Sequence, residues 1–241
     1  MNTWRIAAGF LTTLPIRNPV GLSPKGLGRA AGWFPIVGLV LGAALMATWF
    51  LARLWFPDML TGALVTLAWV ALTGGLHLDG LADACDGLLA TETPSRRLEI
   101  LHDVRVGAFG AIGVALLLLL KAAAVGALID PLPLLLAPIL GRWSLLLGGV
   151  FSPARPAGLG ADFRSGLTRR GLAAAALVTA LAAGLLGWRG LLAFAVAHAV
   201  VFALFRAARV RLGGVTGDVL GAACELAELS VLLASAAKLQ A

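Results

Sequence analysis

Three aspartates, Asp79, Asp83 and Asp86, are spaced four and then three residues apart. On a helix this spacing keeps all three within about 60° of one face. The neighbouring residues are mainly leucine and alanine, so the acidic face belongs to an otherwise apolar segment. Each close pair of ionised carboxylates costs about 4 kcal/mol at an effective dielectric of 20. The pattern favours a bound cation over a merely solvated acidic helix end, and Mg²⁺, whose waters phosphates can replace, is the cation that we expect.

A second polar segment, residues 102–110, contains Asp103 and Arg105. Arg105 is a candidate for binding a phosphate through two parallel hydrogen bonds, and Asp103 could complete a metal shell or orient Arg105. An ordinary basic anchor at a membrane surface explains Arg105 equally well.

A third segment, residues 213–228, places Asp218 and Glu225 seven residues apart on one face of an expected helix. Carboxylates inside an apolar span cost roughly 2.5–3.5 kcal/mol each and usually mark function. We therefore regard both as candidate substrate-binding residues. His77 and Arg142 are weaker candidates for the same role, because His77 faces away from the aspartates on a regular helix and Arg142 could simply extend toward the membrane surface.

The elements that must position these side chains are membrane-spanning helices. Hydrophobic residues make up 60% of the 241 residues and charged residues 13%, about half the charged fraction of a soluble domain. A helical span takes roughly 20 apolar residues. We expect an all-α bundle forming a single domain, residues 1–241, with about seven spans. The expected spans are 33–56, 59–76, 107–129, 131–151, 171–187, 190–205 and 219–237.

The distribution of basic residues predicts the orientation of the bundle. With a cytoplasmic N-terminus, fourteen of the 19 Lys and Arg residues fall on the cytoplasmic side, as expected for an inner-membrane protein. The formal charge of +7 then belongs to loops near anionic lipid, so a nucleic-acid partner is not expected. The aspartates follow the second span directly, which places the candidate site at the cytoplasmic surface. A homo-oligomer is compatible with the sequence but is not predicted by it.

These segments together resemble the cobalamin synthase family, the adenosylcobinamide-GDP ribazoletransferases. The matching motifs are FLTTLPI at 10–16, FPIVGLVLG at 34–42, GGLHLDGLADACDG at 74–87, DVRVGAFG at 103–110 and GGVTGDVLGAACELAE at 213–228. They occur in family order and span nearly the whole chain. Val104 and His102 differ from the residues common in the family, and neither change removes a carboxylate or Arg105.

The resemblance implies an integral membrane enzyme that requires Mg²⁺. Its implied reaction joins adenosylcobinamide-GDP to α-ribazole or its 5′-phosphate, releases GMP and completes the nucleotide loop of cobalamin. Phosphoryl transfer needs mainly positioning and charge neutralisation, which the candidate residues can supply. For this implied reaction Asp83, Asp103 and Arg105 are the candidate catalytic residues, and Asp83 is preferred as the proton acceptor because it is central in its cluster.

Two alternative functions stay open. Gly75, Asp79 and Asp83 reproduce the tail of the CDP-alcohol phosphotransferase signature, so another Mg²⁺-dependent membrane phosphotransferase is the nearest alternative. A transporter of cations or corrinoids is a further alternative. Its intramembrane acids should lie near the bilayer midplane, whereas the acids here are expected to lie at one surface.

Overall fold

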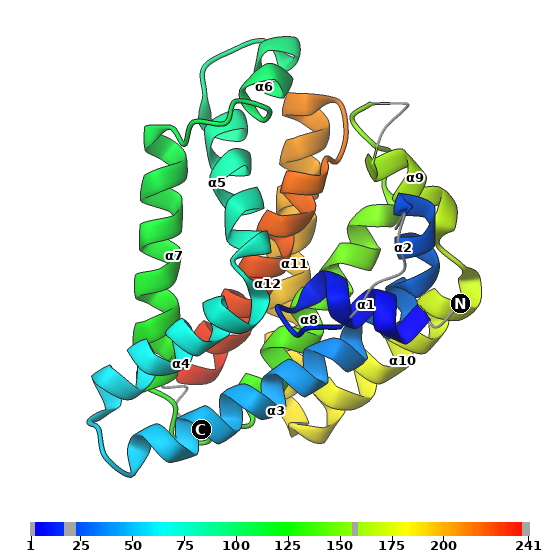
Figure 1. Cartoon of the computed structure of the whole chain (residues 1–241). Coiled ribbons are helices and arrows are strands. Elements are labelled where there is room, and N and C mark those ends of the chain that lie inside the picture. Colours follow the sequence, from blue (N-terminus) through cyan, green and yellow to red (C-terminus); the bar gives the residue numbers. More distant parts are fainter. Residues whose placement is uncertain (1–2, 17–22, 156–158, 238–241) are drawn as a thin grey trace.

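The computed structural model describes residues 3–16, 23–155 and 159–237, which are almost entirely helical (Figure 1). The helices are α1 (Thr3–Leu11), α2 (Pro24–Ala30), the 3-10 turn η1 (Ala31–Trp33), α3 (Phe34–Arg53), α4 (Asp58–Thr73), α5 (Leu76–Leu89), α6 (Pro94–Ile100), α7 (Ala108–Gly126), α8 (Pro133–Val150), α9 (Leu159–Gly166), α10 (Arg169–Leu185), α11 (Gly187–Leu212) and α12 (Gly217–Ala236). Within the described ranges the only β-type pairing is an isolated bridge between Pro153 and Val215. The predicted all-α class is confirmed.

Each predicted span coincides with one helix: α3, α4, α7, α8, α10, α11 and α12. Five helical segments of the described chain are long and apolar enough to cross a membrane by themselves, and α4 with α5 would make a sixth as one bent span. The expected number of about seven is therefore too high by these criteria. With 17 residues, α10 is shorter than a typical span of about 20. The chain is a multi-pass membrane protein.

The outer surface of the bundle is apolar, as a protein facing lipid requires. Leu67, Leu119 and Leu181 lie on three different helices, and each is more than half exposed. Because lipid tails are as apolar as leucine, helices in a bilayer gain little from hiding such residues and associate instead through close packing and polar contacts.

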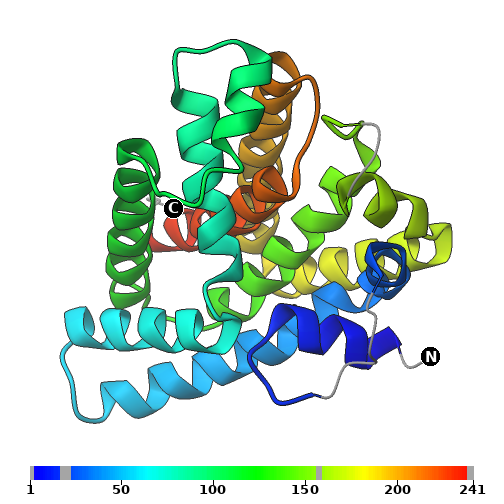
Figure 2. The same ribbon diagram turned by 45° about the horizontal axis from the view of Figure 1, so that its top comes forward.

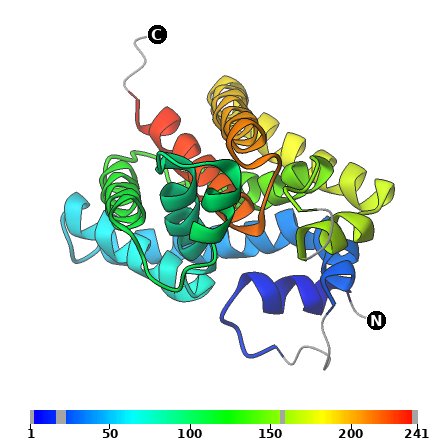
Figure 3. The same ribbon diagram turned by 90° about the horizontal axis from the view of Figure 1, so that it is seen from above.

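At the centre of the bundle lies α12, which packs against α5, α7, α8 and α11. The view from above shows α12 between α5 and α7 on one side and α8 and α11 on the other (Figure 3). A second layer, α3 with α4, crosses the lower part of the molecule, and α1, α2 and α9 gather at the N-terminal side (Figures 1 and 2). The residues that line the cavities described below therefore come from both ends of the sequence.

Two consecutive glycines turn the chain between α4 and α5. Gly74 and Gly75 have φ values of 65° and 69°, in the left-handed region that side chains disfavour. They allow a bend of 95° between the two helices. Because of this bend, α5 leaves the layer of α4 and runs beside α12, which carries the third acidic segment.

Candidate active site

The three aspartates lie on α5, as the spacing predicted, but they have different surroundings. Asp79 is exposed, Asp83 is partly buried and Asp86 is buried. The group of facing acids also includes Asp218, in the first turn of α12. Asp218, Asp79 and Asp86 all lie within electrostatic reach of Asp83. The acidic face of α5 is therefore completed from a second helix.

A glycine contact brings Asp218 to this position. A methyl group on Gly80 would lie 3.1 Å from the carbonyl oxygen of Asp218 and 3.3 Å from Cα of Gly221. Two helix backbones can approach this closely only where neither has a side chain. Gly80 and Gly221 are therefore the residues that let α5 and α12 pack closely.

Asp86 anchors a neighbouring helix. Its carboxylate accepts hydrogen bonds from the backbone N–H groups of Gly107 and Gly110, at 2.8 and 2.9 Å. Gly107 is the N-cap of α7, so the carboxylate also meets the positive end of that helix dipole. Asp86 thus holds α7 against α5. The prediction that it binds metal is not tested by these contacts, and they supply a sufficient structural role.

We expect Asp86→Asn to destabilise the protein by about 1–3 kcal/mol, because an amide can accept only through one oxygen and leaves a backbone N–H facing its NH₂ group. Chemical unfolding in mixed micelles measures this change. If Asp86 acts on α7 alone, the Mg²⁺ concentration that gives half-maximal activity stays the same. A large increase in that concentration would instead identify Asp86 as a metal ligand.

Asp103 and Arg105 form an exposed pair in the loop between α6 and α7. The Arg105 side chain donates from Nε to Oδ1 of Asp103 at 3.0 Å and from Nη2 to Oδ2 at 2.8 Å. These hydrogen bonds lower the pKa of Asp103 to about 2. Asp103 is therefore a weak base at neutral pH, and its contacts fit the predicted role of orienting Arg105 better than that of accepting a proton.

Arg142 and Glu225 lie in a buried network inside the bundle. Lys121 donates to Oε2 of Glu225 at 2.6 Å and also pairs with Glu228, and Glu228 in turn pairs with Arg142. All four side chains are almost fully buried. Arg142 and Glu225, which were predicted to bind substrate, therefore have ion-pair partners within the protein, and the proposed site does not include them. His77 is also buried, but it lines a cavity.

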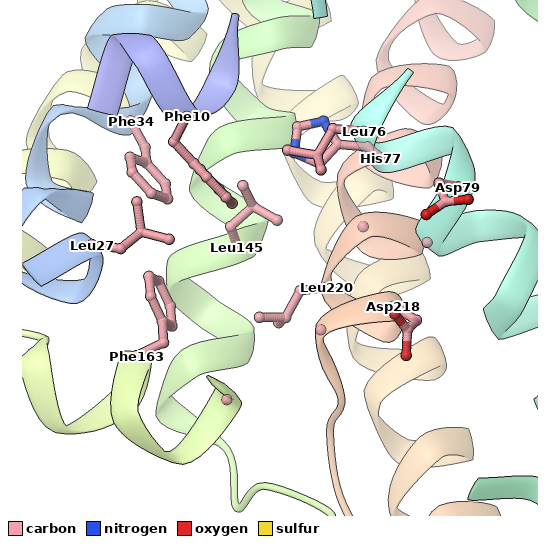
Figure 4. A pocket seen from close by; sticks show the side chains of 14 residues that line it. Phe10, Leu27, Phe34, Leu76, His77, Asp79, Leu145, Phe163, Asp218 and Leu220 are labelled. Carbon is pink, nitrogen blue, oxygen red and sulfur yellow. The ribbon is translucent and has the colours of Figure 1, made fainter. Parts of the chain in front are cut away.

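Two cavities meet at Asp218. The first, of about 350 Å³, lies between α5 and α12 on one side and the N-terminal helices and α9 on the other, and Asp79 and Asp218 line it (Figure 4). The second, of about 300 Å³, is lined by Asp218 together with His102 and Arg155. Nη1 of Arg155 lies 2.7 Å from Nε2 of His102. Asp218 thus lies between an apolar cavity and one that carries basic groups.

The acids also suit a divalent cation. Within the described ranges Asp79, Asp83 and Asp218 form no ion pair with a basic side chain, although they face one another. No three His, Cys, Asp or Glu side chains of those residues are close enough together to hold a metal ion by themselves. Mg²⁺ is commonly bound by one or two carboxylates together with substrate phosphates, so the donor set fits that ion.

A multi-pass helical bundle in which the carboxylate of Asp218 lies between an apolar and a basic cavity, close to further unpaired acids, has the features of a membrane enzyme that acts on phosphorylated small molecules. A family model described as cobalamin-5-phosphate synthase matches residues 3–236. The chain belongs to this family of transferases, as the sequence motifs indicated.

Curated relatives support the same assignment. The chain is 43% identical to the adenosylcobinamide-GDP ribazoletransferase of Ectopseudomonas mendocina (strain ymp), with 98% of each chain covered. It is 41% identical to the enzyme of the same name from Roseiflexus sp. (strain RS-1), over 94% of this chain and 86% of the relative. No solved structure matches the chain.

Proposed function

We propose that this chain is an adenosylcobinamide-GDP ribazoletransferase that joins adenosylcobinamide-GDP to α-ribazole or its 5′-phosphate and releases GMP. The observation that supports this most directly is that Asp218 lines both cavities, with Asp79 beside it in the first and Asp83 within electrostatic reach of both carboxylates. This arrangement suits a two-substrate reaction, because each reacting partner can occupy one cavity with a charged group between them. The names of the relatives supply the substrate pair.

The reaction is a displacement at phosphorus. The acceptor's hydroxyl oxygen attacks the phosphorus that carries the corrinoid's aminopropanol arm. The bond from that phosphorus to the bridging oxygen breaks, and GMP leaves with the electron pair of that bond. Asp83 takes the hydroxyl proton, because it lies between Asp79 and Asp86 on α5 and across from Asp218. Arg105, oriented by Asp103, pairs with a phosphate of the donor.

The proposed cofactor is Mg²⁺, held by one or two of Asp79, Asp83 and Asp218 together with the donor's diphosphate. When bound, it neutralises the charge that develops on the departing phosphate. The sequence predicted Asp79, Asp83 and Asp86 as the metal ligands. The proposed set has Asp218, from α12, in place of Asp86, because both oxygens of Asp86 accept hydrogen bonds from α7. Of the three aspartates on α5, only Asp79 and Asp83 therefore belong to the proposed metal site.

The proposed location is the inner membrane, with the site open to the cytoplasm. The supporting observation is that basic residues gather near the second cavity, which His102 and Arg155 line. Nη1 of Arg211, at the end of α11, donates to the carbonyl oxygen of Leu88 at the end of α5, and Arg97 donates to the same oxygen. The end of the bundle that holds the site is therefore also its basic end, as the positive-inside rule expects of a cytoplasmic face.

Removing divalent metal tests the proposal. Purified protein in lipid nanodiscs is given adenosylcobinamide-GDP and α-ribazole, and GMP is measured by chromatography. We expect release of GMP with Mg²⁺, loss of release after chelation, and recovery when Mg²⁺ is restored, because the repelling acids and the diphosphate need a counter-charge. Undiminished turnover in excess chelator would exclude the metal-dependent mechanism, and absence of GMP under every metal condition would exclude the activity.

A further inference from the structure

The first cavity is almost entirely apolar away from its acidic edge. Three phenylalanines, Phe10, Phe34 and Phe163, form one side of it, opposite the carboxylates of Asp79 and Asp218 (Figure 4). The phenylalanines come from α1, α3 and α9, so elements far apart in the sequence build this one wall. None of the three was predicted from the sequence to have a role.

The three rings form a nearly parallel series. Phe10 and Phe34 have ring centroids 6.3 Å apart at an interplanar angle of 20°, and Phe34 and Phe163 repeat this at 6.3 Å and 21°. Offset, nearly parallel rings are a favoured aromatic arrangement, and they present flat surfaces in a common orientation. A planar ring system that enters the cavity can align with this series.

The polar groups of the cavity are few and lie at its edges. Among the described residues that line it, His77, Asp79 and Asp218 alone have polar side chains, and none is Lys or Arg. Away from that acidic edge, a phosphate inside the cavity would therefore meet no positive side chain of the described residues. Guanine is equally unsuited to the apolar part, because its amide and amino groups would be buried there without partners.

The size of the cavity restricts the ligand further. A cavity of about 150 Å³ takes up one benzene ring, and this cavity has about 350 Å³. That volume suits a two-ring aromatic base and is too small for a corrin macrocycle. Of the groups in the two proposed substrates, the benzimidazole base of α-ribazole is the one that is bicyclic, planar and nearly apolar.

The geometry points to this cavity as the binding site for the benzimidazole base of the acceptor, with the Phe10–Phe34–Phe163 wall as the surface that recognises it. This inference rests on the proposed function, because that function supplies the acceptor. With the base against the phenylalanines, the ribose lies at the acidic edge, where its hydroxyls meet Asp79 and Asp218. The donor's phosphates then lie on the far side of Asp218, in the cavity that carries His102 and Arg155.

Binding of α-ribazole alone tests the assignment without any need for turnover. Full-length protein in nanodiscs is titrated calorimetrically with α-ribazole, with chelator present and no donor. We expect Phe10→Ala to weaken binding about fivefold or more, in line with the loss of one base–aromatic contact. Leu145→Trp, which fills the cavity from α8, should weaken binding at least as much. Phe10 is only partly buried, so this variant keeps the test available if Leu145→Trp does not fold.

Matched controls are available on the outer surface. Phe50→Ala and Leu181→Trp make the same kinds of change at exposed positions on α3 and α10 and should leave the affinity for α-ribazole unchanged. In the complete reaction, Phe10→Ala should raise KM for α-ribazole and leave KM for adenosylcobinamide-GDP unaltered. An unchanged affinity for α-ribazole in the cavity variants, or an increase in KM for the donor alone, would overturn the assignment.

The two proposals fail in different ways. If wild-type protein binds α-ribazole through Phe10 but releases no GMP, the transferase activity is excluded and the binding site stands. If GMP is released normally while Phe10→Ala and Leu145→Trp bind α-ribazole as the wild type does, the activity stands and the base lies elsewhere.

Discussion

Asp83→Asn is expected to lower the rate of GMP release by about 10³-fold or more. A positioned general base contributes about 10²–10⁴-fold, and the substitution also removes one of the negative charges that attract the metal. Asparagine has nearly the same shape, and Asp83 forms no ion pair within the described ranges, so its replacement should not unfold the protein. Single-turnover measurement of GMP release with saturating substrates reports the loss directly.

The control for this experiment is Asp58→Asn. Asp58 pairs with Arg53 at an exposed turn between α3 and α4, at a distance of 3.1 Å, and lines none of the cavities described above. Its replacement should leave turnover unchanged. Normal turnover by Asp83→Asn would rule out Asp83 as the base. A proportional loss of folded protein in that variant would show that the carboxylate supports the fold and not the chemistry.

The helical positions and the acidic face could be predicted because both depend on local periodicity. Long apolar stretches place helices, and a spacing of i, i+4 and i+7 places side chains on one face whatever lies around them. The ends of the helices were less predictable. The span expected at 190–205 belongs to α11, which continues to Leu212, because Arg206, Arg209 and Arg211 interrupt the hydropathy without breaking the helix. The helix stops at Gly213, where φ is 82°.

The partners of the acidic face could not be predicted in the same way. Whether Asp218 lies beside the acidic face of α5 depends on which helices pack on α5, and the Gly80–Gly221 contact brings it there. Sequence periodicity could not predict the phenylalanine wall either, because its three residues lie on three different helices and each resembles an ordinary core residue. The signal present in the sequence was weaker: Phe10 and Phe34 both fall within the short family-like motifs near the N-terminus.

The sequence could have predicted that the buried charges pair with one another, although the particular partners depend on helix packing. Lys121, Arg142, Glu225 and Glu228 all lie within apolar spans, and their formal charges cancel. Since isolated charges are costly inside a membrane protein, two positive and two negative groups predict mutual pairing. The network they form joins α7, α8 and α12, and Lys121 also lies 4.4 Å from the ring centre of Trp69 on α4. Its position inside the bundle favours a structural role.

Glu228→Gln should therefore destabilise the protein strongly, by about 3–5 kcal/mol, because it leaves Arg142 buried without a carboxylate. Nε and Nη2 of Arg142 already have no hydrogen-bond partner among the described residues, so no second acceptor is in place to compensate. Unfolding by denaturing detergent in mixed micelles measures the change in free energy.

Two comparison variants separate charge balance from packing. Glu225→Gln should destabilise less, because Lys121 keeps Glu228 and each cation still contacts a carboxylate. Adding Arg142→Met to Glu228→Gln restores neutrality and should recover most of the lost stability, as replacing a buried ion pair by uncharged groups often does. If the double variant is as unstable as Glu228→Gln alone, the network stabilises the bundle through its particular contacts, and the balance of buried charge contributes less to stability than those contacts do.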